Sequence, residues 1–457
     1  MQRTPKTLLI EYSQEHAMLA NQLIEKYGQL FRIKSLLGGN EIILSDLKGV
    51  AHILKNETIY EKSEPLRYML SRITGHGVLT TEGEVHKKQR RVMNPAFGSA
   101  QIRDVTEIFV EKSVQLRDVW VSQLNKTDVI TVDALSWLSK MTLDVIGHAG
   151  FDYQFNALSG RPNEFNDSFS HIMESQNHIT PELLLKMLPE ADSFLRKAQA
   201  TSTRIGRELL ETRKAISSGG KNAYGRDLLS LLVRSNTSSE VPESQRLTDD
   251  EVIAPTAFAL FALSSSPSAI EIQSKLRTEV LSIPTDNPTM DELNALPYLD
   301  QVVRECLRVF APVPATARIA TRDDVIPLAA PYQDRYGVWH EEFRVRKGQE
   351  IQIPIIAINR DKNIWGDDAL EFRPERWESL PEAVKDIPGV WGNLLTFLWW
   401  FACVYRMKAL LFTLVRVFEF ELAVPKEDVL IKRAFPVHRP YIKGVGNALP
   451  LKIRLVQ

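Results

Sequence analysis

The chain has 457 residues but only two cysteines, Cys306 and Cys403. Two cysteines cannot make the disulfide framework of a small secreted scaffold, so the sequence predicts a protein that folds in a reducing compartment. An excess of charge of one sign is also lacking, because 56 lysines and arginines face 57 aspartates and glutamates. This balance offers no electrostatic argument for binding nucleic acid, and the histidines show no metal-ligand spacing.

A long hydrophobic run is lacking as well. The first twenty residues include several charged ones, namely Arg3, Lys6, Glu11 and Glu15. We therefore expect neither a signal peptide nor a membrane anchor in this chain. The most apolar stretch, residues 394–405, is followed closely by Arg406 and Lys408. It is too short to cross a bilayer and is predicted to lie in the core.

The hydrophobic residues, 44% of the chain, are numerous enough to build a large core. Length alone would suggest two or three domains. Apolar residues recur at helical spacing and predict helices at 105–124, 135–146, 183–195 and 298–310. Strands are predicted within 31–44 and 319–356, and the polar, breaker-rich stretches 217–221 and 235–245 predict surface loops.

One helical segment carries a Glu-x-x-Arg tetrad formed by Glu305 and Arg308, and it runs into Ala311 and Pro312. An acid and a base three residues apart on a helix are usually an ordinary surface ion pair. Here, however, the motif Phe-Arg-Pro-Glu-Arg-Trp follows at 372–377, and Cys403 comes later within an aromatic run. In this order the motifs resemble the cytochrome P450 family of haem-thiolate monooxygenases, in its eukaryotic, fungal-type form.

The resemblance extends over most of the chain. Residues 26–28, 31–33 and 41–44 resemble the first helix and hairpin of the family. Residues 347–348 begin a turn into 351–358, and 359–361 with 364–366 resemble the stretch before the Pro-Glu-Arg segment. Residues 82–97 resemble the helix whose Trp-x-x-x-Arg motif contacts a haem propionate. In this chain His86 stands in place of the Trp, and Arg90 in place of the Arg.

The resemblance implies a mainly α fold with small β-sheets, the cytochrome P450 fold, in a single large domain over residues 1–457. It implies haem b as cofactor, Cys403 as the iron ligand, and Arg90 and Arg318 as partners of the haem propionates. Glu305, Arg308 and Arg376 would form a structural charge cluster. The implied partners are a hydrophobic small-molecule substrate and NADPH-cytochrome P450 reductase. The implied location is the cytoplasmic side of the endoplasmic reticulum, with only peripheral membrane contact for this chain.

Several of these residues also have simpler interpretations. Arg90 could be a solvated member of the basic run 87–91. His86 is expected to pack or to form hydrogen bonds rather than bind iron. Cys306, inside the Glu-x-x-Arg helix, is most simply a small packed residue.

The segment around Cys403 departs from the family pattern Phe-x-x-Gly-x-Arg-x-Cys-x-Gly. Phe397 lies six residues before Cys403, one fewer than in the pattern. Aromatic residues at 399–401 replace a glycine and the propionate-binding arginine, and Tyr405 replaces the second glycine. Glycines let the backbone approach the porphyrin and supply amide donors to the sulfur, which bulky aromatics cannot do.

The central helix of the family also appears in altered form. Residues 249–254 resemble its start and 259–263 its end, but the acid-alcohol pair that relays protons is not found between them. Thr256 is the remaining weak catalytic candidate, and Pro255 beside it is predicted to interrupt the helix. We therefore expect a malformed oxygen-binding side and poor use of electrons.

Three interpretations of the chain remain open from the sequence. The chain could be an active monooxygenase that hydroxylates a hydrophobic small molecule. It could instead be a catalytically impaired relative that binds haem or lipid. It could also be the product of an aberrant gene model, because both departures remove compact blocks while the flanking sequence stays family-like.

Overall fold

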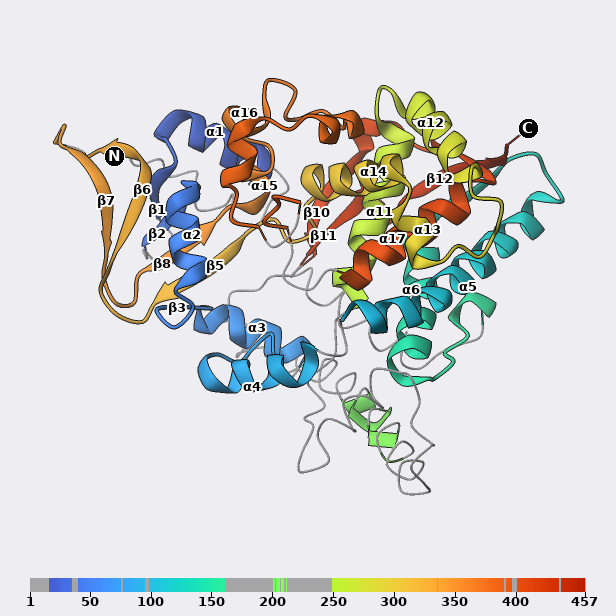
Figure 1. The fold of residues 1–457 in the computed structure, drawn as a ribbon, viewed down its shortest axis with the longest axis horizontal. Helices are drawn as coiled ribbons and strands as arrows, with labels where there is room; N and C mark the ends of the chain where they lie inside the picture. Colours follow the sequence, from blue (N-terminus) through green and yellow to red (C-terminus); the bar gives the residue numbers. More distant parts are fainter. Residues whose placement is uncertain are drawn as a thin grey trace.

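The largest sheet and most of the long helices lie in different parts of the molecule (Figure 1). The computed structural model describes residues 16–34, 40–74, 77–94, 98–160, 249–334, 336–389, 392–396, 401–434 and 437–456, and parts of 200–211. Most of the long helices pack together on the right of Figure 1, and the largest sheet lies on the left. The predicted helix at 183–195 and the predicted loops at 217–221 and 235–245 lie outside the described residues.

The helices confirm the mainly α prediction. They are α1 (His16–Tyr27), α2 (Leu47–Lys55), α3 (Glu64–Thr74), α4 (Gly83–Met93), α5 (Ser99–Leu124), α6 (Ala134–Phe151), α11 (Asp249–Ser265), α12 (Ala269–Leu281), α13 (Met290–Asn294), α14 (Pro297–Val309), α15 (Ile355–Ile358), α16 (Lys362–Trp365) and α17 (Phe401–Val415). Short 3-10 helices occur at η4 (Ala157–Ser159), η5 (Pro374–Glu378), η6 (Glu382–Asp386) and η7 (Lys426–Asp428).

The strands form small sheets. The largest has the order β1-β2-β8-β5-β3, from β1 (Leu30–Lys34), β2 (Asn40–Leu44), β8 (Glu350–Ile353), β5 (Thr316–Ala320) and β3 (Tyr60–Glu61). A second joins β4 (Ile130–Asp133), β12 (Pro450–Leu455) and β9 (Phe418–Leu422). Two hairpins complete the set, β6 (Asp324–Gln333) with β7 (Trp339–Val345) and β10 (Val429–Ala434) with β11 (Val437–Ile442).

The predicted strands within 31–44 and 319–356 are confirmed, and β1 and β2 pair antiparallel as the predicted first hairpin. The C-terminal strands β9 to β12 were not predicted. The alternation of Phe418, Phe420 and Leu422 would have indicated β9, because every second residue of a half-buried strand faces the core.

Local chemistry explains where several elements begin. The Asp46 carboxylate accepts a hydrogen bond from the Gly49 amide at 2.8 Å and so caps α2. The same carboxylate accepts the amides of Ala329 and Ala330, which ties α2 to β6. Pro297 occupies the first turn of α14, where its missing N–H costs no helical hydrogen bond.

A single cluster of buried hydrophobic side chains connects these parts. It extends from Ile42 in the largest sheet to Ile453 in β12 and includes Leu260 of α11, Leu307 of α14 and Leu410 of α17. Burial of apolar surface is the dominant favourable contribution to folding. Among the described residues, no helix combines the length and apolar character needed to cross a bilayer.

The prediction that Pro255 interrupts the central helix was wrong. Helix α11 is continuous from Asp249 to Ser265 and passes through Pro255. The proline removes the hydrogen bond to the carbonyl of Glu251. The helix persists because it is anchored beyond the proline, where Ala257, Leu260 and Leu263 are fully buried. Its 17 residues give a length of about 25 Å.

Candidate functional site

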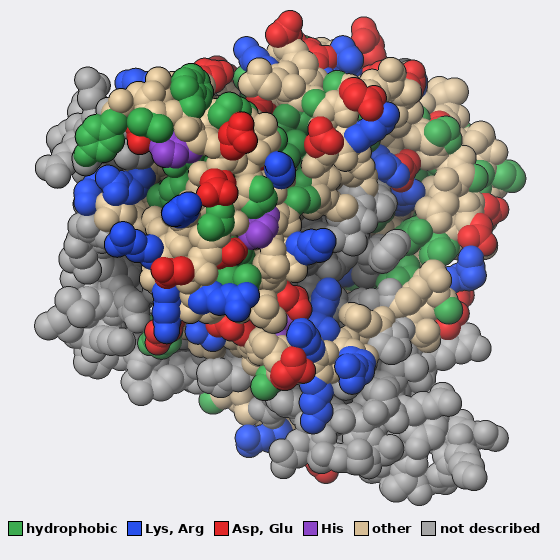
Figure 2. Space-filling model, turned by 60° about the vertical axis from the view of Figure 1, so that its left-hand side comes forward, with side chains coloured by type: hydrophobic (Ala, Val, Ile, Leu, Met, Phe, Trp, Pro, Cys, Tyr) green, Lys and Arg blue, Asp and Glu red, His purple; other side chains and the backbone are tan. Residues whose placement is uncertain are grey.

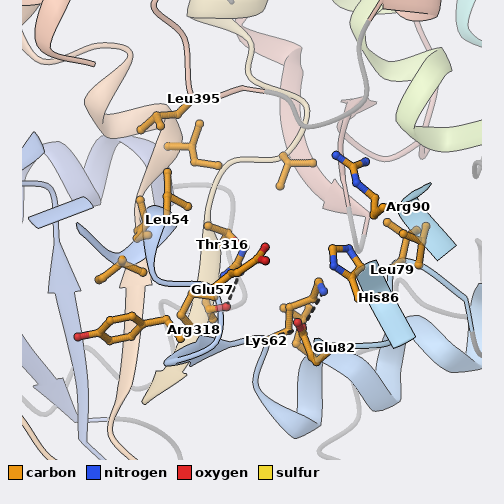
Figure 3. Close-up of a pocket in the computed structure, with 18 of the residues that line it drawn as sticks. Leu54, Glu57, Lys62, Leu79, Glu82, His86, Arg90, Thr316, Arg318 and Leu395 are labelled. Carbon is orange, nitrogen blue, oxygen red and sulfur yellow. Dashed lines mark hydrogen bonds and ion pairs between the residues drawn. The ribbon is translucent and has the colours of Figure 1, made fainter. Parts of the chain in front are cut away.

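The residues predicted to bind the cofactor lie around a cavity of about 820 Å³. Arg90, Arg318 and Cys403 all line it, although they come from α4, β5 and α17. Figure 3 shows the part of the cavity that is lined by Arg90 and His86 together with Lys62, Glu82 and Arg318. The volume is within the usual range for small-molecule and cofactor sites, roughly 300–1,000 Å³.

Helix α4 supplies His86 and Arg90 from one face, since residues four apart on a helix lie above one another. Burial lowers the pKa of His86, and the nearby positive charge of Lys62 lowers it further. Burial also lowers the pKa of Arg90, with Glu57 acting in the opposite direction. His86 is therefore expected to be neutral at pH 7, while Arg90 remains charged because its pKa starts far above neutrality.

Arg318 reaches the cavity from β5, where its backbone pairs with Ile351 of β8. Its guanidinium donates hydrogen bonds to the Thr316 hydroxyl at 2.6 Å and to the Ala317 carbonyl at 2.8 Å. Burial lowers the pKa of Arg318, and Glu82 partly offsets this effect. The side chain is therefore a partly desolvated cation whose charged form would gain from a nearby anion.

Lys62 and Glu82 are cavity residues that the motif comparison did not assign to the site. The Lys62 ammonium lies 2.7 Å from a Glu82 carboxylate oxygen, and both side chains are less than one-fifth exposed. Glu82 immediately precedes α4, and Lys62 immediately follows β3. No motif links two residues that lie twenty positions apart, so only the fold brings them together.

Cys403 is buried, with 6% of its surface exposed, and lines the cavity. Helix α17 (Phe401–Val415) begins before this cysteine and contains it. The glycines that would keep this stretch out of a helix are replaced here by aromatic residues and Tyr405. The structure therefore places the thiol in the first turn of α17.

Cys306 lies in α14, where it is fully buried in the hydrophobic core. Burial raises the pKa of its thiol well above the usual value, and the carboxylate of Glu305 adds to the effect. Cys306 is thus a neutral packed thiol, as a small core residue would be.

Glu305, Arg308 and Arg376 meet in one buried network, and none of them is more than 2% exposed. The Glu305 carboxylate accepts two hydrogen bonds from Arg308, at 2.9 and 2.8 Å, and a longer one from Arg376 at 3.4 Å. Arg308 also donates to three backbone carbonyls, those of Asn359, Ala369 and Glu371. Such a fork of donors is a property of arginine that lysine cannot reproduce.

Thr256 lies apart from these residues. It is buried in α11, with 3% of its surface exposed. Among the described residues that line the cavity, none comes from α11. The structure thus does not bring Thr256 together with Arg90, Arg318 and Cys403.

The lining of the cavity suits a haem. Five basic side chains and two acidic ones face it, which are Lys62, Lys87, Arg90, Arg91 and Arg318 with Glu57 and Glu82. Apolar walls come from Leu54, Leu79 and Leu395, among others (Figure 3). The outer face in Figure 2 carries basic and acidic side chains intermixed, whereas the cavity has an excess of basic ones. One thiol, apolar walls and surplus cations match the iron, ring and carboxylates of haem.

Comparison with known proteins identifies the family. The family model described as Cytochrome P450 matches residues 6–385. The chain belongs to the cytochrome P450 family. Membership implies a haem cofactor and electrons from a redox partner, and it makes the protein a haem monooxygenase in general terms.

Relatives of this P450 include fungal proteins. The chain is 45% identical to Cytochrome P450 monooxygenase 205 of Postia placenta, with 97% of this chain and 89% of the relative covered. It is 43% identical to Cytochrome P450 monooxygenase 128 of the same organism, with 96% and 88% covered. It is 30% identical to Cytochrome P450 monooxygenase claW of Ampulloclitocybe clavipes, with 98% and 90% covered.

The alignments also bear on the altered motifs of this P450. The alignment with monooxygenase 205 is 487 positions long, whereas the chain has 457 residues, so at least 30 aligned positions have no counterpart here. The family-model match ends at residue 385, before Cys403. The segment around Cys403 is thus the part of the predicted site that the family model does not cover.

Proposed function

We propose that this P450 binds haem b and inserts one oxygen atom from O2 into a hydrophobic small molecule. The electrons would come from NADPH through NADPH-cytochrome P450 reductase. The observation that carries the proposal is the cavity that Cys403 shares with Arg90 and Arg318. Family membership supports the general reaction, and the apolar walls favour a hydrophobic substrate.

Each residue of the site has a defined task in this proposal. A haem with a thiolate ligand supplies the chemistry that splits the O–O bond. Cys403 holds the iron, and Arg90 and Arg318 hold the haem carboxylates through charge-assisted hydrogen bonds. Leu54, Leu79 and Leu395 exclude water from the ring. The Glu305, Arg308 and Arg376 network has a structural task, since it joins α14 to the segment that contains η5.

The domain organisation and cellular location of the enzyme are part of the same proposal. We propose that residues 1–457 form one catalytic domain that works, with its reductase partner, at the cytoplasmic side of the endoplasmic reticulum. Any membrane contact of this chain would be peripheral. Fractionation of cells that express the chain, with carbonate extraction of the membranes, tests this setting, and recovery in the carbonate-resistant membranes would contradict it.

An absorption spectrum tests the central proposal. Purified protein loaded with haem, reduced and exposed to carbon monoxide, should show the red-shifted Soret band of a thiolate ligand. A haem band typical of a nitrogen ligand, or no haem binding at all, would overturn the assignment of the cavity.

The unmodified chain should form little product per NADPH consumed. Proton delivery needs an acid or alcohol within hydrogen-bond reach, directly or through one water. Thr256 is the one hydroxyl between Ala254 and Ala259, and it does not line the cavity. Insertion of an Ala-Gly-Ala-Glu-Thr-Thr block after Ala254 should raise the product formed per NADPH consumed several-fold.

The control for this experiment is an equally long block of alanines at the same place, which restores helix length without the acid and the alcohol. The ratio of product to NADPH is measured for the three proteins. Tight coupling in the unmodified chain, or equal improvement by the alanine block, would contradict the role given to the missing acid-alcohol pair.

A further inference from the structure

Lys62 is held firmly at the wall of the cavity. Its ammonium donates to the Glu82 carboxylate at 2.7 Å and to the Thr81 carbonyl at 3.3 Å. Its backbone N–H donates to the same Glu82 oxygen at 3.1 Å. Because two donors of one residue converge on Glu82, the lysine side chain has little freedom to turn away from the cavity (Figure 3).

The charges around Lys62 are predominantly positive. Burial lowers the pKa of Lys62, Glu82 raises it, and the cation of Arg318 lowers it again. The same lysine contributes to the lowered pKa of His86. Lys62 is therefore electrostatically coupled to both Arg318 and His86, and the cavity has five basic side chains against its two acidic ones, Glu57 and Glu82. An anion placed between Lys62 and Arg318 would stabilise the charged forms of both.

The sequence lacks one of the cations that bind haem in the family pattern. Aromatic residues occupy 399–401, where the family pattern has a propionate-binding arginine. Haem b has two carboxylates, and a buried carboxylate requires charged or hydrogen-bonding partners. In this chain a further, partly buried cation comes from Lys62, which directly follows β3.

We propose that Lys62 is a further cofactor-positioning residue, which together with Arg318 holds one haem carboxylate in place of the arginine missing near Cys403. Glu82 positions the lysine and is not itself a cofactor ligand. This inference rests on the proposed haem site. It differs from that proposal because it assigns roles to Lys62 and Glu82, which the motif comparison did not assign to the site.

The test is a titration of the apoprotein with haem b and with haem dimethyl ester, in which both carboxylates are blocked. Absorbance gives the dissociation constant of each complex, with no turnover required. Lys62→Met should weaken binding of haem b about tenfold, since a hydrogen bond to a charged group is lost. It should leave the affinity for the dimethyl ester unchanged.

Three further variants separate a cofactor contact from a purely structural ion pair. Lys62→Arg keeps the cation and should retain the affinity of the wild type for haem b. Glu82→Gln keeps an amide oxygen that can accept from the Lys62 ammonium and backbone N–H, so it should hold the lysine in place without the negative charge and should not weaken haem b binding. Lys55→Met, which removes an exposed lysine at the end of α2, is the matched control and should change neither affinity.

The outcomes are distinct. Equal loss of haem b affinity in Lys62→Met and Glu82→Gln, or equal weakening of both haems by Lys62→Met, would show that the ion pair is only structural. Unchanged haem b binding by Lys62→Met, in a protein whose wild type has the thiolate spectrum, would overturn the Lys62 assignment alone. A wild type that binds no haem would overturn the proposed function as well.

Discussion

Glu305→Ala is expected to prevent accumulation of folded protein. The Glu305 carboxylate is fully buried and accepts hydrogen bonds from both arginines of the network, from the Arg373 amide and from the Trp377 indole. Its removal leaves the Arg308 guanidinium buried without its anion, and it leaves Arg376 with Asp368 as its remaining carboxylate partner. Loss of one partner of such a pair costs roughly 3–5 kcal/mol, a large part of the roughly 5–15 kcal/mol that stabilises a typical domain.

The measurement is the yield of soluble protein together with the urea midpoint of unfolding. Glu382→Ala is the matched control, because that carboxylate is 86% exposed and pairs with Lys385 on the surface. We expect the control to change the free energy of unfolding by less than about 1 kcal/mol. A folded Glu305→Ala protein with an unchanged midpoint would show that the network does not stabilise the fold.

Arg308→Lys probes the geometry of the same network. A lysine keeps the positive charge but cannot donate to Glu305 in bidentate fashion while also reaching the carbonyls of Asn359, Ala369 and Glu371. The unfolding midpoint should therefore fall well below that of the wild type, although charge is conserved. A midpoint equal to that of the wild type would mean that charge alone matters.

Cys403→Ser is expected to abolish the thiolate-type Soret band completely. Cys403 is the cysteine that lines the cavity, whereas Cys306 is fully buried in α14 with a pKa raised well above its usual value. A serine hydroxyl cannot replace the thiolate that pushes electron density onto the iron. The measurement is the spectrum of the reduced protein with carbon monoxide.

Cys306→Ala serves as the control for this experiment. It removes a buried sulfur and should lower stability modestly, but it should leave the thiolate band in place. Survival of the band in Cys403→Ser, or its loss in Cys306→Ala alone, would mean that the wrong cysteine has been assigned to the iron.

Local patterns were good predictors where one element carries the signal. The apolar spacing of residues 298–310 predicted α14, and the tetrad of Glu305 and Arg308 lies on that helix. The same reasoning failed at Pro255. The free energy that one proline costs a helix is smaller than the free energy that packing of the following buried residues contributes to α11. It also missed β9, although Phe418 and Phe420 alternate with polar residues.

The sequence by itself determined the family, the mainly α fold and the identity of the motif residues. These follow from residue types at short, regular spacings that one helix or one strand can display. Only the tertiary structure decided that Arg90, Arg318 and Cys403 share a cavity from which Thr256 is absent, and that Cys403 lies within α17. It also decided that Lys62 pairs with Glu82. The physical reason is that charges and cavities depend on distances between elements far apart in the chain, and packing of the core sets those distances.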